Sequence, residues 1–143
     1  MLKTLLATSL AAFVLTACES QPVTAAAAPK PPQQPRTFML FFDFDRSTLT
    51  PGALNIVKEA ANAAKANHNA LIICTGHTDS AGAPAYNMTL SLRRASAVKE
   101  ALVRDGVPDQ SIDVWGRGEE ALLVRTRDGA REPQNRRVEI LIQ

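Results

Sequence analysis

Residues 74–102 decide the fold of this chain and read CTGHTDSAGAPAYNMTLSLRRASAVKEAL. The apolar run at residues 70–74 is short, rich in branched side chains and followed by Gly76, a pattern typical of a buried strand. Further along, apolar residues recur at helical spacing until Gly106 and Pro108 predict the end of a helix. These apolar residues are Leu90, Ala95, Val98 and Leu102. The stretch therefore predicts a strand, a turn of small residues and a long helix.

Asp79 and Arg94 are the two charges of this stretch that can face one cleft. Asp79 lies just past the predicted strand, and Arg94 lies about one turn beyond Leu90 on the predicted helix. If the helix packs back on the strand, an acid and a base are held apart for a ligand that carries both signs. An aspartate at a strand end can instead cap a turn, so both readings of Asp79 stay open here.

The segments on either side complete a small α+β domain. Residues 37–44 contain four of the five Phe residues of the chain, and this density predicts a central strand. A helix is predicted at residues 51–67, because Thr50 is a favourable N-cap and Pro51 fits the first helical position. Its predicted buried stripe consists of Leu54, Val57, Ala61 and Ala64.

The C-terminal third predicts two more strands. Residues 111–115 form the third strand, with Trp115 expected in the core. Residues 121–124 are either a short helix or a packed loop, and an irregular loop at residues 126–134 leads to the last strand at residues 136–142. Strand–helix–strand units place their strands in parallel, whereas the last strand is free to run antiparallel. The prediction is a mixed four-stranded sheet with two main helices packed on one face.

The N-terminus reads as a lipoprotein signal followed by a tether. Residues 1–17 combine Lys3 with an apolar core and end in Leu-Thr-Ala before Cys18, which resembles the bacterial lipoprotein cleavage box. Cys18 would then be acylated, with the following Glu19 favouring the outer membrane; an ordinary secretory signal cleaved near Ala17 is the alternative. Residues 18–36 add a Pro- and Ala-rich spacer without aromatic residues.

Composition excludes a general affinity for nucleic acid. The 143 residues carry a formal net charge of +2 and only seven aromatic side chains, namely five Phe, one Tyr and one Trp. A nucleic-acid surface requires a basic field and stacking aromatic residues. Binding to a polymer must therefore come from a local site.

Four ordered blocks resemble the OmpA-like C-terminal domain over residues 37–143. They are FFDFD at 41–45, GHTD at 76–79, N-x-x-L-S-x-x-R-A-x-x-V-x-x-x-L at 87–102 and NRRVEI at 135–140. The resemblance implies a β-α-β-α-β-β sandwich that binds peptidoglycan non-covalently, without cofactor, metal or catalysis. The ligand would be the diaminopimelate residue of the stem peptide.

The resemblance also implies roles for single residues. Asp79 would pair with the ligand ammonium, and Arg94, which directly precedes Ala95, would hold its carboxylate through two parallel hydrogen bonds. Arg136 would orient Asp79 or be a plain surface arginine, and Asn87 would contact the ligand or cap the helix. The remaining expected contributors are Asp45, as an acceptor, with Thr78 and Leu90 shaping the pocket. Arg93 is expected on the surface. Arg137 is expected to be structural, with Asp43 either as its partner or as a strand-end cap.

His77, Asp79 and Ser80 do not predict a hydrolase. A catalytic triad needs groups that converge from separate segments with the base between nucleophile and carboxylate, and neighbours on one strand end seldom meet that geometry. A metal site is disfavoured because the chain has only two His residues and Cys74 lies in an apolar strand. His77 is expected to be packed or hydrogen-bonded.

Three functions remain open after this reading. The first is an outer-membrane lipoprotein that links the membrane to the wall. The second is a Pal-type component of the Tol system, which is less favoured because the chain has HTDSAG and LSLRR where that type tends to have ADERG and GERR. The third is a periplasmic module that binds a protein partner and does not need Asp79 or Arg94.

Overall fold

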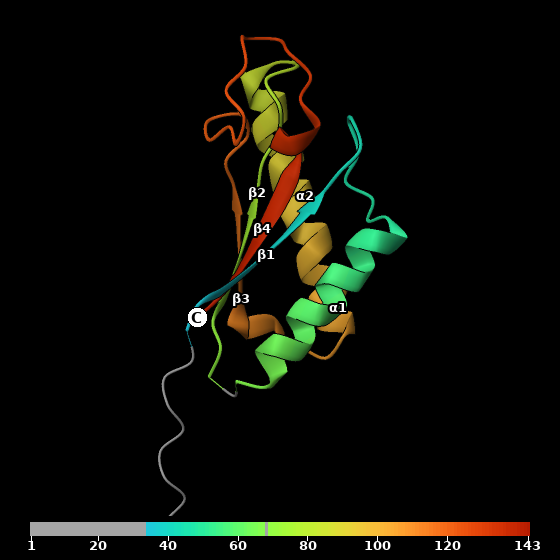
Figure 1. Ribbon diagram of the computed structural model, residues 1–143, viewed down its shortest axis with the longest axis vertical. Coiled ribbons are helices and arrows are strands. Elements are labelled where there is room, and N and C mark those ends of the chain that lie inside the picture. Colours follow the sequence, from blue (N-terminus) through green and yellow to red (C-terminus); the bar gives the residue numbers. More distant parts are fainter. Residues whose placement is uncertain (1–33, 68) are drawn as a thin grey trace, which may run out of the picture. The chain divides into compact units, whose positions relative to one another are not determined.

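The computed structural model describes residues 34–67 and 69–143. Four strands and two helices follow one another as β1 (Arg36–Phe41), α1 (Pro51–Lys65), β2 (Ile72–Gly76), α2 (Pro84–Arg104), β3 (Ile112–Gly116) and β4 (Arg137–Ile142) (Figure 1). Two 3-10 turns, Asp109–Ser111 and Pro133–Asn135, precede β3 and β4. The predicted signal segment, the lipidated Cys18 and the tether up to residue 33 lie outside the described residues.

One mixed sheet holds the strands in the order β1-β4-β2-β3. β2 and β3 pair in parallel, whereas β4 lies antiparallel to both β1 and β2. The predicted α+β class, the mixed sheet and the antiparallel last strand are thus confirmed. The central position expected for β1 was wrong, because β4 inserts between β1 and β2 and leaves β1 at the edge. β1 also begins one residue earlier than expected, with Arg36 opposite Ile142.

Both helices cover the same face of the sheet, where they form the core (Figure 1). The inward residues alternate along each strand, as the two-residue period of a strand requires. They include Leu40, Ile72, Cys74, Val138 and Ile140, each no more than 1% exposed. Burial raises the pKa of the Cys74 thiol to about 12, which fits the expected role of this residue as a small apolar side chain.

Two side chains expected in the core are exposed. Trp115 is 60% exposed because Ile112 and Val114 of β3 face the helices, so their neighbour points to the uncovered face of the sheet. Leu54 is 42% exposed. The buried stripe of α1 is Ala53, Val57, Ala60, Ala61 and Ala64, rotated slightly from the predicted one. The Thr50 cap was correct, since its hydroxyl accepts a hydrogen bond from the Ala53 amide at 3.2 Å.

α2 crosses β2 closely, and glycine makes this approach possible. A Cβ atom on Gly76 would lie 2.0 Å from the Ser91 carbonyl oxygen, a distance that no side chain tolerates. The close contact brings the first half of α2 against the residues that follow β2. Those residues, from His77 to Ser80, are buried and polar.

Candidate ligand-binding site

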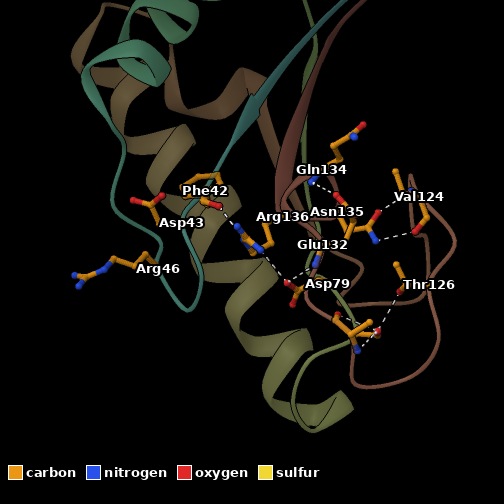
Figure 2. A network of polar contacts seen from close by, with 12 residues as sticks. Phe42, Asp43, Arg46, Asp79, Val124, Thr126, Glu132, Gln134, Asn135 and Arg136 are labelled. Atoms are coloured by element: carbon orange, nitrogen blue, oxygen red, sulfur yellow. Dashed lines mark hydrogen bonds and ion pairs between the residues drawn. The ribbon is translucent and has the colours of Figure 1, made fainter.

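Asp79 lies in the buried segment beyond β2 and is 3% exposed. Its Oδ2 atom accepts hydrogen bonds from Arg136 Nη1 at 3.1 Å and from the Glu132 amide at 3.2 Å (Figure 2). The preceding residue is held by a hydrogen bond from the Thr78 amide to the Gly118 carbonyl at 2.8 Å. The Arg136 side chain and the backbone amides of Thr78 and Glu132 therefore fix the orientation of the Asp79 carboxylate.

Arg136 carries out the role expected of it towards Asp79. It precedes β4 and spans the gap between two segments, donating from Nε to the Phe42 carbonyl at 3.1 Å and from Nη1 to Asp79 (Figure 2). Arg136 also lines a groove of about 260 Å³ together with Phe41, Phe42, Asp43, Pro133 and Gln134.

Arg94 is fully buried on α2. Its Nε donates to the Arg46 carbonyl at 2.8 Å, its Nη1 to the His77 carbonyl at 2.8 Å and its Nη2 to the Asp43 carbonyl at 3.1 Å. The guanidinium also stacks over the Phe42 ring, 5.2 Å from its centroid. Burial lowers the pKa of Arg94 to about 10, and the nearby Asp79 opposes that decrease. The side chain thus stays cationic at neutral pH, and its neighbour Arg93 is exposed, as expected.

The segment at residues 43–46 covers Arg94 and is itself anchored to α2. Asp45 has a φ of 55°, in the left-handed region, and its Oδ1 accepts a hydrogen bond from the Tyr86 hydroxyl. Arg93 in turn lies over the Tyr86 ring at 5.7 Å. A ligand carboxylate that reaches Arg94 must therefore replace the carbonyl of Asp43 or Arg46.

Three other predicted residues take different positions. Asn87 does not cap α2, whose N-cap is Ala83; its amide nitrogen donates to the Asp79 carbonyl at 3.3 Å and to Glu119 at 2.5 Å. Thr78 is 1% exposed, and its hydroxyl has no hydrogen-bond partner among the described residues. Leu90 is buried at 5% exposure. Both Thr78 and Leu90 therefore belong to the interior side of the site.

Arg137 is structural, as expected, but the candidate partner was wrong. Its Nε donates to Glu139 Oε1 at 2.7 Å, whereas Asp43 contributes its backbone carbonyl to Arg94. The reason is the two-residue strand period, which places Arg137 and Glu139 on the same face of β4. His77 is packed beside them, with its backbone amide bonded to the Arg137 carbonyl at 2.8 Å. Burial in the first place lowers the pKa of His77 to about 4.

The loop before β4 is ordered by polar contacts that the sequence did not reveal. The Ser80 hydroxyl contacts Thr126 Oγ1 at 3.3 Å and donates to the Arg127 carbonyl at 2.9 Å, and the Asn135 amide exchanges two 2.8 Å hydrogen bonds with the Val124 backbone (Figure 2). The loop thereby brings the Glu132 amide to Asp79. The contributions of Tyr86, Glu119 and Glu132 had no signal in the spacing of the motifs, except that Glu119 follows a Gly-x-Gly turn.

The described residues do not form groups suited to a metal or a membrane span. Across residues 34–67 and 69–143 no three His, Cys, Asp or Glu side chains converge as a candidate metal centre. Within the same residues, neither helix has the length and apolar character that crossing a bilayer requires.

The fold and the buried charges of Asp79 and Arg94 define a small α+β domain with a cluster of buried polar side chains beyond the end of β2. A family model described as the OmpA family matches residues 41–136. The chain belongs to the OmpA family.

Individual relatives agree with this assignment. An outer membrane protein of Gluconacetobacter diazotrophicus is 49% identical over 117 residues, which is 78% of this chain and 31% of the relative. A peptidoglycan-associated lipoprotein of Legionella pneumophila is 37% identical over 111 residues, covering 78% of this chain and 63% of the relative. The chain thus spans between about a third and two thirds of the length of these curated relatives.

Solved structures show the same fold. The crystal structure of the peptidoglycan-associated lipoprotein from Burkholderia pseudomallei superposes with a TM-score of 0.69 at 30% identity, covering 74% of this chain and 90% of that one. The OmpA-like domain of FopA1 from Francisella tularensis gives a TM-score of 0.67 at 23% identity, covering 75% and 71%. These neighbours confirm the predicted domain family and its architecture.

Proposed function

We propose that this protein binds peptidoglycan without catalysing a reaction, by holding the free zwitterionic end of diaminopimelate between Asp79 and Arg94. The observation that carries the proposal is that a carboxylate and a guanidinium are both buried beyond the end of β2: Asp79 is 3% exposed, and Arg94 donates to the carbonyl of His77, two residues before Asp79. Relatives that are named peptidoglycan-associated lipoproteins and outer membrane proteins support a role in the cell envelope.

In this proposal each charge binds one half of the ligand. Oδ2 of Asp79 is engaged by Arg136 and Glu132, and a carboxylate has about four acceptor positions, so Asp79 retains capacity for an ammonium. Arg94 has five N–H groups, of which three bond to carbonyls. A ligand carboxylate forms stronger, charge-assisted bonds than those carbonyls and can therefore displace the segment at residues 43–46.

The test uses three synthetic stem tripeptides that differ only at the third residue. One carries meso-diaminopimelate, one carries 2-aminopimelate, which lacks the distal ammonium, and one carries lysine, which lacks the distal carboxylate. Calorimetry with the full-length protein should show the diaminopimelate peptide binding at least about tenfold more tightly than either analogue, since charge-assisted bonds are worth roughly 1.5–3 kcal/mol.

Two site variants and one control variant identify which residue binds which end of the ligand. Asp79→Asn should erase the preference over the 2-aminopimelate peptide, and Arg94→Lys should erase the preference over the lysine peptide, because a lysine cannot form the two parallel bonds. Arg93→Ala is the matched control, being adjacent and exposed, and should bind like the wild type. Equal binding of all three peptides by the wild type would disprove the proposal and favour a module for a protein partner.

We further propose that the protein is an outer-membrane lipoprotein anchored through lipid on Cys18. The support is the sequence Leu-Thr-Ala-Cys at residues 15–18 after an apolar core and the lipoproteins among its relatives. Cells grown with an alkyne-labelled fatty acid should label the wild type and not a Cys18→Ser variant, and the label should fractionate with the outer membrane. An unlabelled wild type would show that the segment is an ordinary secretory signal.

A further inference from the structure

Glu119 reaches the site from the loop beyond β3, although nothing in its motif marks it as functional. Its Oε2 atom accepts a hydrogen bond from Asn87 Nδ2 at 2.5 Å, and the same nitrogen donates to the Asp79 carbonyl at 3.3 Å. A side-chain amide nitrogen has two hydrogens, so these two contacts use both of them. Asn87 is 1% exposed, which leaves its amide nitrogen no free donor for a ligand.

The segment that carries Glu119 is wedged between α2 and the residues around Asp79. The Gly118 amide donates to Ser91 Oγ at 2.9 Å, and the Gly118 carbonyl accepts from the Thr78 amide at 2.8 Å. Gly118 has a φ of 53°, and a Cβ atom there would lie 3.1 Å from the Met88 amide nitrogen. Position 118 therefore suits glycine alone. The hydrogen bonds of Gly118 on both sides fix the backbone position from which the Glu119 side chain extends.

The pair acts on the backbone of Asp79, whereas Arg136 acts on its carboxylate. Arg136 and the Glu132 amide hold the Asp79 carboxylate, whereas Asn87 holds the carbonyl of the same residue. Glu119 determines which way the Asn87 amide points, because a carboxylate accepts only from the nitrogen and repels the amide oxygen. Without Glu119 the amide keeps only its longer, 3.3 Å hydrogen bond to the Asp79 carbonyl, so the donor to the backbone of Asp79 is held less firmly.

We propose that Glu119 and Asn87 form a positioning pair that aims Asp79 at the distal ammonium of the ligand. This inference rests on the proposed function, in which Asp79 receives that ammonium. Neither residue contacts the ligand in this role, so Asn87 is neither a helix cap nor a ligand contact. The pair should determine selectivity for the ammonium and leave the affinity for the carboxylate unchanged, since the carboxylate is held by Arg94.

The experiment measures this selectivity with the diaminopimelate and 2-aminopimelate tripeptides on the full-length protein. Glu119→Ala should reduce the preference for diaminopimelate by about tenfold, the value of one well-placed charge-assisted bond. Its affinity for the 2-aminopimelate peptide should stay that of the wild type. Glu119→Gln should restore the preference, because the amide oxygen of Gln still accepts from Asn87. Glu120→Ala, an adjacent and exposed position, is the matched control.

A role that is merely structural would give a different pattern. In that case Glu119→Ala would weaken the binding of both peptides equally. Either that result or an unchanged preference for the diaminopimelate peptide would overturn the pairing role. If the Glu119→Ala protein unfolds below the assay temperature, Glu119→Asp is the second variant. Its carboxylate is withdrawn by one methylene, so an intermediate preference for the diaminopimelate peptide is expected. A preference equal to that of the wild type would overturn the proposal. A wild type without any preference would instead disprove the proposed function, and the pairing role with it.

Discussion

The two halves of α2 bury different kinds of side chain against the same sheet. The C-terminal half buries Val98, Ala101 and Leu102 in the apolar core. The N-terminal half buries Asn87, Ser91 and Arg94, each of them with hydrogen-bond partners from other segments. One helix thus joins the core of the domain to its polar site.

The difference shows how stability and recognition are divided. Apolar burial is non-directional and scales with area, so the C-terminal half can lose a contact without misdirecting any group. Each polar group of the N-terminal half has specific partners, and removing one leaves a buried donor or acceptor unpaired. Substitutions in the apolar half should therefore change the free energy of unfolding, whereas those in the polar half should change ligand selectivity.

The largest effect on stability is expected from Leu102→Ala. Leu102 is fully buried, and truncating a buried leucine costs about 3 kcal/mol through lost transfer energy and the cavity that remains. Urea unfolding measures this loss. The folded variant should bind the diaminopimelate tripeptide like the wild type, because Leu102 packs in the apolar core, eight residues along α2 from Arg94.

Val103→Ala is the matched control for that substitution, since Val103 is the next residue and is 38% exposed. It should change the free energy of unfolding by less than about 0.5 kcal/mol. A Leu102→Ala protein that is folded but binds the tripeptide poorly would contradict the division between the two halves.

Much of the apolar half could be predicted from the sequence, because its signals are local. The spacing of Ala95, Val98 and Leu102 determines one helix face, and the Thr50 cap determines where α1 begins. Properties that depend on the whole sheet were not predictable in this way. The edge position of β1 follows from β4, whose sequence comes about 100 residues later in the chain. Trp115 was misplaced because hydrophobicity outweighed the strand alternation that turns it to the uncovered face.

The candidate site likewise contains residues that the sequence motifs predicted and residues that they did not. The family motifs pointed to Asp79, Arg94 and Arg136, of which Arg136 and Asp79 form an ion pair at 3.1 Å and Arg94 bonds to the His77 carbonyl. The supporting contacts join residues far apart in sequence, such as Tyr86 to Asp45 and Asn87 to Glu119. Their formation depends on loop conformations, including the positive φ angles of Asp45 and Gly118. No local pattern encodes those conformations, so the positions of these partners appear only in the folded chain.

The smaller of the two stability effects is a pH dependence of His77, which lies beyond β2 and accepts a hydrogen bond from Arg94 of the polar half. His77 is 4% exposed, and burial, together with the charges of Arg137 and Arg117, lowers its pKa from 6.5 to about 4, against the opposing charge of Glu139. The unfolded chain therefore binds a proton between pH 6.5 and 4 that the folded chain does not bind. Stability contributed by neutral His77 is complete above pH 6.5 and decreases as the pH falls towards 4.

Urea unfolding at pH 7 and pH 5 should show a loss of about 2 kcal/mol in the wild type that is absent from His77→Gln. His68 and the carboxylates are common to both proteins, so the difference between the two curves isolates His77. The His77 carbonyl accepts a hydrogen bond from Arg94. If the free energy of unfolding depends on pH in the same way in both proteins, protonation of His77 is not linked to unfolding.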